Sequence, residues 1–247
     1  MRKSTILIGI VVILAVIFLG LQVFEQLSIS YKVRPFILPL LTLAYVFKYK
    51  DSQSFFFLFL LFFSIAELLS GIIYFDAENI TLDNFQYYTG NICLILAYIF
   101  LILEIYKTLK FKEVLKLYPI HILILLALDV YCIVLVSKIS INSGFMEYNI
   151  EYIIEVVYNC CIMLLLTIAL INYLHNDSNK SMSLLIASIC LLFSEVIQVA
   201  FYYVKYMFFL EIISSILLVT AFSILFVQAK LNYADAKKFK TLDKLEA

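Results

Sequence analysis

The chain has 247 residues, of which 64% are hydrophobic and 15% are charged. This apolar share exceeds the roughly 45–50% of soluble domains, and the mean hydropathy is +1.03. The composition therefore predicts a polytopic membrane protein and excludes a soluble globular domain. Because 18 basic residues balance 18 acidic ones, there is no overall positive charge to attract nucleic acid, and no nucleic-acid partner is expected.

Apolar runs long enough to cross the hydrocarbon core of a bilayer recur along the chain. A core of about 30 Å requires roughly 20 residues of helix, and windows of that size predict eight membrane-spanning helices. Their predicted ranges are 4–24, 34–48, 54–75, 84–106, 117–137, 150–173, 181–204 and 207–228. The second range is short and contains Pro35 and Pro39, which predicts a kinked or tilted span. The predicted fold class is an all-α, polytopic transmembrane helical bundle formed by residues 1–228.

The placement of lysine and arginine residues supports the number of spans. With eight spans, most basic residues fall on the side of the membrane that holds both chain termini. The positive-inside rule then predicts that both termini are cytoplasmic, and the expected location is the bacterial inner membrane. Residues 229–247 are expected to form a cytoplasmic basic tail. Apolar residues recur in this tail at helical spacing, which fits an amphipathic helix at the membrane interface. A solvated tail is the alternative interpretation.

Acidic residues inside the predicted spans are the clearest chemical signal. Glu67, Asp129 and Glu195 lie near the middle of their spans, and Glu155 and Glu211 add to an acidic cluster in the outer half of the membrane. An acidic side chain at the centre of a spanning helix costs about 2.5–3.5 kcal/mol, and no lysine or arginine within a span is expected to neutralise these residues. Burial and like charge both favour the protonated form of a carboxyl group. The cluster therefore indicates acid–base chemistry, proton or cation coupling in a transporter, or structural hydrogen bonds between helices.

Several other chemistries are excluded by what the sequence lacks. There is no phosphate-binding loop, no nucleophile-elbow motif and no glycine-rich dinucleotide motif. The two histidines, His121 and His175, are too few and too distant for a catalytic zinc site, and the five cysteines lie in apolar runs as core residues. No metal and no cofactor are expected.

Short motifs in several spans resemble the YhhN family of lysoplasmalogenases. The motifs are Arg34-Pro35 opening the second span, Phe63-Ser64 followed by Ala66-Glu67 in the third, Gly90 and Tyr98 in the fourth, Tyr158 in the sixth, Ser194-Glu195 in the seventh and Gln228 near the end of the eighth. The family has lysine in place of Arg34, aspartates in place of Glu67 and Glu195, and histidine in place of Tyr98.

The resemblance implies hydrolysis of the vinyl-ether bond of a lysoplasmalogen, with release of a fatty aldehyde. The implied catalytic carboxylates are Glu67 and Glu195, and Asp129 is a third candidate. One carboxylic acid would donate a proton to the enol-ether carbon, and another carboxylate would stabilise the resulting cation and activate water, by analogy with glycosidases. The substrate-binding residues implied are Arg34 for the phosphate, together with Ser64, Tyr98, Tyr158, Ser194 and Gln228.

Two other functions remain open at the level of the sequence. The replacement of both aspartates by glutamate, together with Tyr98, fits a lipid-binding relative without catalysis. The acidic cluster also fits a transporter coupled to protons or cations. For the hydrolase and for the lipid-binding relative, the expected partners are the bilayer and a membrane lipid or lysolipid. The sequence makes no prediction of the oligomeric state.

Overall fold

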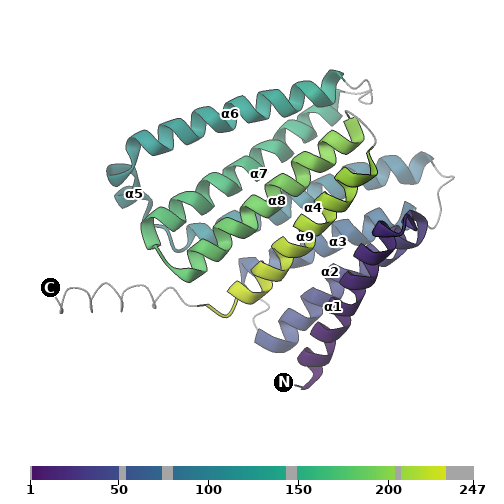
Figure 1. Ribbon diagram of the computed structural model, residues 1–247. Coiled ribbons are helices and arrows are strands. Elements are labelled where there is room, and N and C mark those ends of the chain that lie inside the picture. The colour runs from purple at the N-terminus through teal and green to yellow at the C-terminus, as the bar shows by residue number, and fades with distance from the viewer. Residues whose placement is uncertain (1, 50–53, 74–79, 143–148, 204–206, 232–247) are drawn as a thin grey trace. The chain divides into compact units, whose positions relative to one another are not determined.

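The computed structural model describes residues 2–49, 54–73, 80–142, 149–203 and 207–231, and the regular structure within them is entirely α-helical (Figure 1). The helices in these residues are α1 (Arg2–Val23), α2 (Leu27–Tyr49), α3 (Phe55–Ile73), α4 (Ile80–Tyr106), α5 (Phe111–Leu117), α6 (Pro119–Asn142), α7 (Asn149–Asn176), α8 (Asn179–Tyr203) and α9 (Phe208–Gln228). The predicted all-α fold class is confirmed. The predicted tail lies outside the described residues from residue 232 onward.

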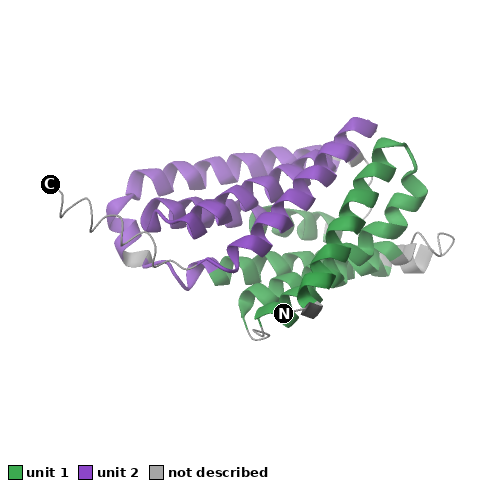
Figure 2. Cartoon of the chain, turned by 60° about the horizontal axis from the view of Figure 1, so that its bottom comes forward, with its two compact units in different colours: residues 1–104, 144–161 green, residues 105–143, 162–247 purple. Residues whose placement is uncertain are grey.

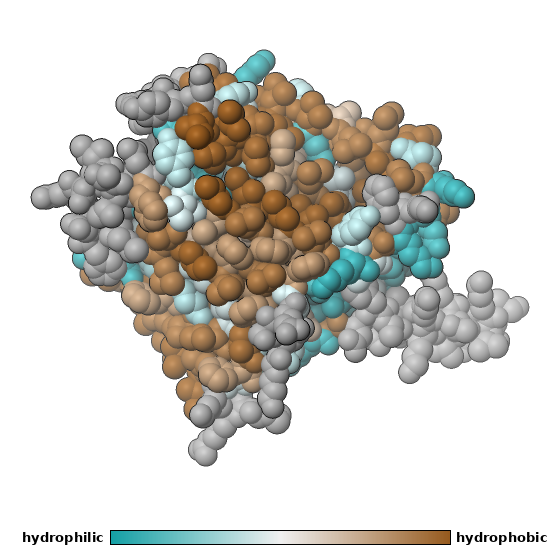
Figure 3. Space-filling model, turned by 180° about the vertical axis from the view of Figure 1, so that it is seen from behind, coloured by the Kyte–Doolittle hydropathy of each residue, from teal (hydrophilic) through white to brown (hydrophobic). Residues whose placement is uncertain are grey.

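Seven of the helices in the described part of the chain are long and apolar enough to cross a membrane, namely α1, α2, α4, α6, α7, α8 and α9. The short second predicted span is among them, as part of α2. The third predicted span corresponds to α3, whose apolar part, Phe55–Gly71, is shorter than the other seven. Apolar residues cover most of the face shown in Figure 3, as contact with lipid requires. The chain is therefore a helical integral membrane protein.

The helices fall into two compact units, coloured green and purple in Figure 2. Unit 1 comprises residues 1–104 and 144–161, and unit 2 comprises residues 105–143 and 162–247. Unit 1 therefore holds α1, α2, α3, most of α4 and the first half of α7. Unit 2 holds α5, α6, α8, α9 and the second half of α7.

Within unit 1, α2 packs against both α1 and α3. Helix α2 begins at Leu27 and continues through Pro35 and Pro39, so the prediction that Arg34-Pro35 opens the second span is wrong. Proline is tolerated inside membrane helices where neighbouring helices compensate for the missing backbone donor. The Pro35 ring packs directly on Gly71 of α3, where a Cβ atom would lie 2.8 Å from Pro35 Cβ. A glycine at position 71 is what allows this close approach of α2 and α3.

Hydroxyl side chains mark the starts of two helices. Ser54 caps α3, because its Oγ accepts a hydrogen bond of 3.2 Å from the backbone N–H of Phe57. At the start of α8, the backbone N–H groups of Ser178 and Ser181 each donate to the other's hydroxyl oxygen, at 3.0 and 3.2 Å. This reciprocal pair is a capping box, and it ends the tight turn after α7, in which Asp177 has a φ of 42°.

Within unit 2, α8 and α9 form an antiparallel pair, and α6 packs against α8. Alanine and leucine side chains fill the interior of this unit, and Ala187, Leu191, Ala221 and Leu225 are fully buried. The sequence predicted one span beginning at residue 117, whereas a separate short helix, α5, precedes α6. Pro119 is the first residue of α6. Proline suits this position because backbone N–H groups in the first turn have no acceptor within the helix, so the N–H that proline lacks costs no hydrogen bond.

Candidate functional site

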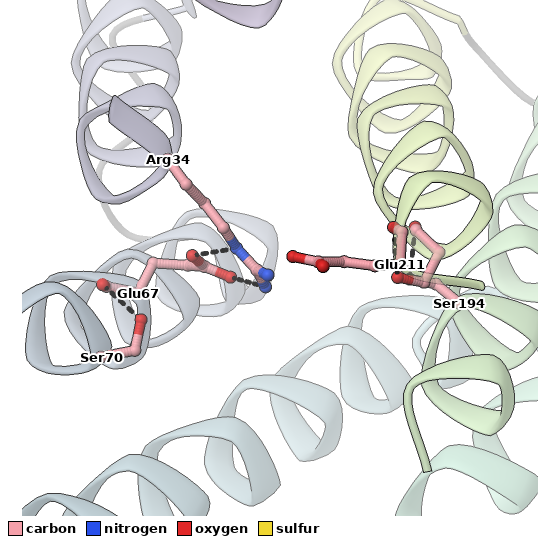
Figure 4. A network of polar contacts seen from close by, with 6 residues as sticks. Arg34, Glu67, Ser70, Ser194 and Glu211 are labelled. Carbon is pink, nitrogen blue, oxygen red and sulfur yellow. Dashed lines mark hydrogen bonds and ion pairs between the residues drawn. The ribbon is translucent and has the colours of Figure 1, made fainter. Parts of the chain in front are cut away.

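A part-buried ion pair joins α2 to α3 in unit 1. The Nε and Nη2 atoms of Arg34 donate to the two carboxylate oxygens of Glu67, at 2.9 and 2.8 Å, as Figure 4 shows. The side chains are 24% and 7% exposed, respectively. The expectation that no basic residue within a span neutralises these acids is therefore wrong for Glu67. Both carboxylate oxygens act as acceptors, which is the arrangement of an ionised carboxylate with a guanidinium group.

Hydroxyl groups extend this polar contact between α2 and α3. The Thr42 and Ser64 hydroxyl oxygens lie 2.7 Å apart, and both lie within hydrogen-bond distance of the Leu60 carbonyl oxygen, at 3.2 and 2.6 Å. Near Glu67, the Ser70 hydroxyl donates to the Glu67 backbone carbonyl at 2.9 Å. The predicted site residue Ser64 thus lies one helical turn from Glu67, on the face of α3 that contacts α2.

Three aromatic rings pack edge to face beside this side of α3 in unit 1. The Tyr98 ring of α4 makes edge-to-face contacts with Phe63 of α3, at a centroid distance of 6.0 Å, and with Tyr158 of α7, at 5.7 Å. Tyr98 is fully buried, and Tyr158 is 6% exposed. Edge-to-face pairs of this kind stabilise a core beyond the area they bury. Five of the predicted site residues therefore lie in unit 1: Arg34, Ser64, Glu67, Tyr98 and Tyr158.

Asp129 has its own partner in unit 2. Its Oδ2 atom accepts a hydrogen bond of 2.7 Å from the hydroxyl of Thr167, which joins α6 to α7. Both side chains are buried, with exposed fractions of 5% and 4%. Most of α6 is otherwise exposed, because only 11% of its apolar stretch is buried. The Asp129–Thr167 contact therefore attaches a mainly exposed helix to its neighbour.

The other two acids predicted within spans of unit 2, Glu195 and Glu211, lie on the α8–α9 pair. The Ser194 hydroxyl donates to the Ser214 backbone carbonyl at 2.8 Å, and the Ser214 hydroxyl donates to the Glu211 backbone carbonyl at 3.0 Å. Figure 4 shows Ser194 and Glu211 on these neighbouring helices. Glu211 is 7% exposed, and Glu195 is half-buried. Ser194 therefore serves to join two helices, beside a glutamate with partial access to the protein surface.

Gln228 does not lie with Ser194 and Glu195. The Ser194–Ser214 contact sets the register of the antiparallel α8–α9 pair. Gln228 is at the end of α9, so at about 1.5 Å per residue it lies roughly 20 Å along the helix from the level of Ser194. Gln228 is buried nonetheless, and its Oε1 atom has no hydrogen-bond partner.

Sequence reasoning missed Thr42, Thr167 and the role of Gly71. A signal for two of them was present, because Arg34, Thr42 and the buried Tyr45 recur at spacings that place them on one face of a helix. On α3, Leu60, Ser64, Glu67 and Gly71 recur in the same way. Two complementary polar stripes on consecutive helices predict an antiparallel contact once both helix starts are known.

The part of the chain that the structure describes has no group of three His, Cys, Asp or Glu side chains placed to share a metal ion. All five cysteines are free thiols. The chain matches no model of a known protein family, and neither curated proteins nor solved structures match it. The fold and these contacts define a helical integral membrane protein whose helices are joined by buried hydrogen bonds and an ion pair. The resemblance to the YhhN family remains a prediction from short motifs.

Proposed function

We propose that the protein is a membrane-embedded hydrolase of the lysoplasmalogenase type, which cleaves the vinyl-ether bond of a lysolipid. The observation that carries this proposal is the bidentate contact of Glu67 with Arg34 at 2.8 and 2.9 Å. It supports an ionised carboxylate in a setting where an unpaired one would be costly. In such a reaction an ionised carboxylate stabilises the positive charge of the oxocarbenium-like cation.

In this proposal two carboxyl groups have different roles. A carboxylic acid, for which the resemblance supplies Glu195 as the candidate, donates a proton to the enol-ether carbon and leaves a cation stabilised by Glu67. Water then adds to the cation and gives its proton to Glu67, forming a hemiacetal. Collapse of the hemiacetal returns one proton to the acid, while Glu67 protonates the departing alcohol oxygen. Both groups end in their starting states, and the products are a fatty aldehyde and a glycerophospho-headgroup.

Arg34 receives a different role from the one implied by the resemblance. Its guanidinium binds and orients the Glu67 carboxylate through two parallel hydrogen bonds, which suits arginine better than lysine. The hydroxyls of Thr42 and Ser64 keep α3 in register with α2, so that the carboxylate stays in place. Arg34 is thus a positioning residue in this mechanism rather than the phosphate ligand.

The membrane arrangement we propose has eight spans with both termini in the cytoplasm of a bacterial cell. Helix α3 has 19 residues, which at about 1.5 Å per residue gives roughly 28 Å, close to the thickness of a hydrocarbon core. Its pairing with α2 through buried polar contacts also supports a place inside the membrane. The partners would be the bilayer and a membrane lipid or lysolipid, which could enter from the side.

The experiment that tests the proposal measures aldehyde release from a vinyl-ether lysolipid by the purified protein in detergent. Glu67→Gln and Glu195→Gln should each abolish release at a temperature where the variants remain folded. Glu113→Gln is the matched control, because it removes an exposed carboxylate in the same way. Retained activity in both glutamine variants would refute the mechanism, and no release by the folded original protein would refute the hydrolase.

One observation favours a second candidate, a lipid-binding protein without catalysis. Tyr98, at the position of the family's histidine, is fully buried between two aromatic rings. A side chain enclosed in this way contributes packing rather than proton transfer. Saturable binding of the same lysolipid without aldehyde release would support this candidate over the hydrolase.

A further inference from the structure

The segment between α4 and α6 is basic and lies next to the membrane. Helix α4 ends at Tyr106 and α6 begins at Pro119, and both helices are long and apolar enough to span. The residues between them therefore lie at a membrane–water boundary. Residues 107–116 carry lysines at 107, 110, 112 and 116 and one acid, Glu113, and Glu104 lies one helical turn before Lys107.

Several contacts within unit 2 hold this segment in place. The Thr108 hydroxyl donates to Asn172 Oδ1 at 3.3 Å, and the Tyr118 hydroxyl donates to the Leu174 carbonyl at 3.2 Å. Both acceptors belong to the last turns of α7. Val114, in the middle of α5, is fully buried. The segment is thus anchored at both ends and at its centre, which presents Leu115, Lys116 and Leu117 in a defined direction.

The exposed side chains of α5 combine leucine with lysine. Leu115 and Leu117 are 42% and 63% exposed. At about 100° per residue they lie on either side of Val114 around the helix, while Lys116 lies on the opposite face. Lys107 and Lys110 are exposed as well. The pair Lys110–Glu113, at 3.1 Å with both side chains largely exposed, is a surface pair and offsets little of the positive charge.

We propose that this segment, which we call the α5 platform (residues 107–118), is a binding surface for anionic lipid headgroups. Leu115 and Leu117 would enter the boundary of the acyl chains, and Lys107, Lys110 and Lys116 would contact phosphates. Amphipathic helices with basic and apolar faces bind membrane surfaces in this way, and lysine clusters directly beside a spanning helix attract anionic lipids. This inference goes beyond the proposed hydrolase and does not depend on it.

The chain contains no tryptophan, so Leu117→Trp introduces a single fluorescent reporter into the α5 platform. The full-length variant is reconstituted into vesicles of phosphatidylglycerol and phosphatidylcholine mixed at equal amounts. Either the anionic or the zwitterionic lipid carries brominated acyl chains, which quench a nearby indole. The brominated anionic lipid should quench the indole more than the brominated zwitterionic lipid does. The difference should correspond to an enrichment of the anionic lipid around the reporter of about fivefold, which is the enrichment that the attraction of one lysine produces. The preference should fall as salt is added, because salt screens exposed charges.

A lysine variant and a matched control identify the source of the preference. Replacing Lys107, Lys110 and Lys116 with glutamine should abolish it. Replacing Lys237, Lys238 and Lys240 in the C-terminal tail removes the same charge and should leave it unchanged. Leu115→Trp provides a second reporter in case the first disturbs folding. Equal quenching by both lipids, no quenching by either, or a preference that survives the loss of the platform lysines would overturn the proposal.

Discussion

The Arg34–Glu67 pair makes a quantitative prediction about stability. Glu67→Gln leaves a guanidinium group in a mostly buried position without its counter-charge, and breaking a buried pair in this way costs about 3–5 kcal/mol. Because 24% of the Arg34 side chain is exposed and can reach water, we expect a loss near the lower end, about 3 kcal/mol. For a chain of this size that corresponds to a decrease in Tm of about 6–12 °C.

The assay is a double-mutant cycle on thermal unfolding in detergent, with Arg34→Gln, Glu67→Gln and the double variant. If the two charges stabilise each other, the double variant should lose less free energy than the sum of the single losses, by about 1–3 kcal/mol. The same cycle on the exposed pair Lys110–Glu113 is the control, and it should give a coupling of only about 0.2–0.5 kcal/mol. Single losses at positions 34 and 67 that add within about 0.5 kcal/mol would refute the reasoning.

Three further predictions concern packing, a buried carboxylate and topology. Gly71→Ala should lower stability by about 1–3 kcal/mol in thermal unfolding, because the new Cβ would overlap the Pro35 ring. Thr167→Val should cost about 1–3 kcal/mol by the same measurement, because Asp129 would remain buried without its donor. A fluorescent protein fused to the C-terminus should be cytoplasmic, and so should one fused to the N-terminus, because the eight spans that we propose place both ends on one side.

Matched controls separate these effects from general sensitivity to mutation. Gly90→Ala places a methyl group where no atom lies within 4 Å, so it should be neutral or stabilising by up to about 1 kcal/mol. Thr220→Val changes an exposed threonine of α9 and should have little effect. Equal losses at Gly71 and Gly90, or at Thr167 and Thr220, would contradict the packing and hydrogen-bond arguments. Termini on opposite sides of the membrane would show that α3 does not span.

The helices themselves were predictable because their driving force is local in the sequence. Backbone groups in a membrane must be paired internally, so each long apolar run can only become a helix. The prediction failed at the boundary of α2, where Lys32, Arg34 and Pro35 resemble the end of a span. The helix nevertheless begins at Leu27, and Arg34 within it is paired with Glu67, which is 33 residues away in the chain. The seven-residue helix α5 was missed because it is too short to give an apolar window.

The sequence by itself determined the class of protein, the positions of the long apolar helices and the presence of acidic residues within them. All three follow from composition along a single stretch of chain. Only the tertiary structure decided which polar groups meet: Glu67 with Arg34, Asp129 with Thr167, and Ser194 with the Ser214 carbonyl. It also placed Gln228 far from Ser194. Partner choice depends on which helices pack together, in what register and with which face inward, and these are set by contacts between distant residues.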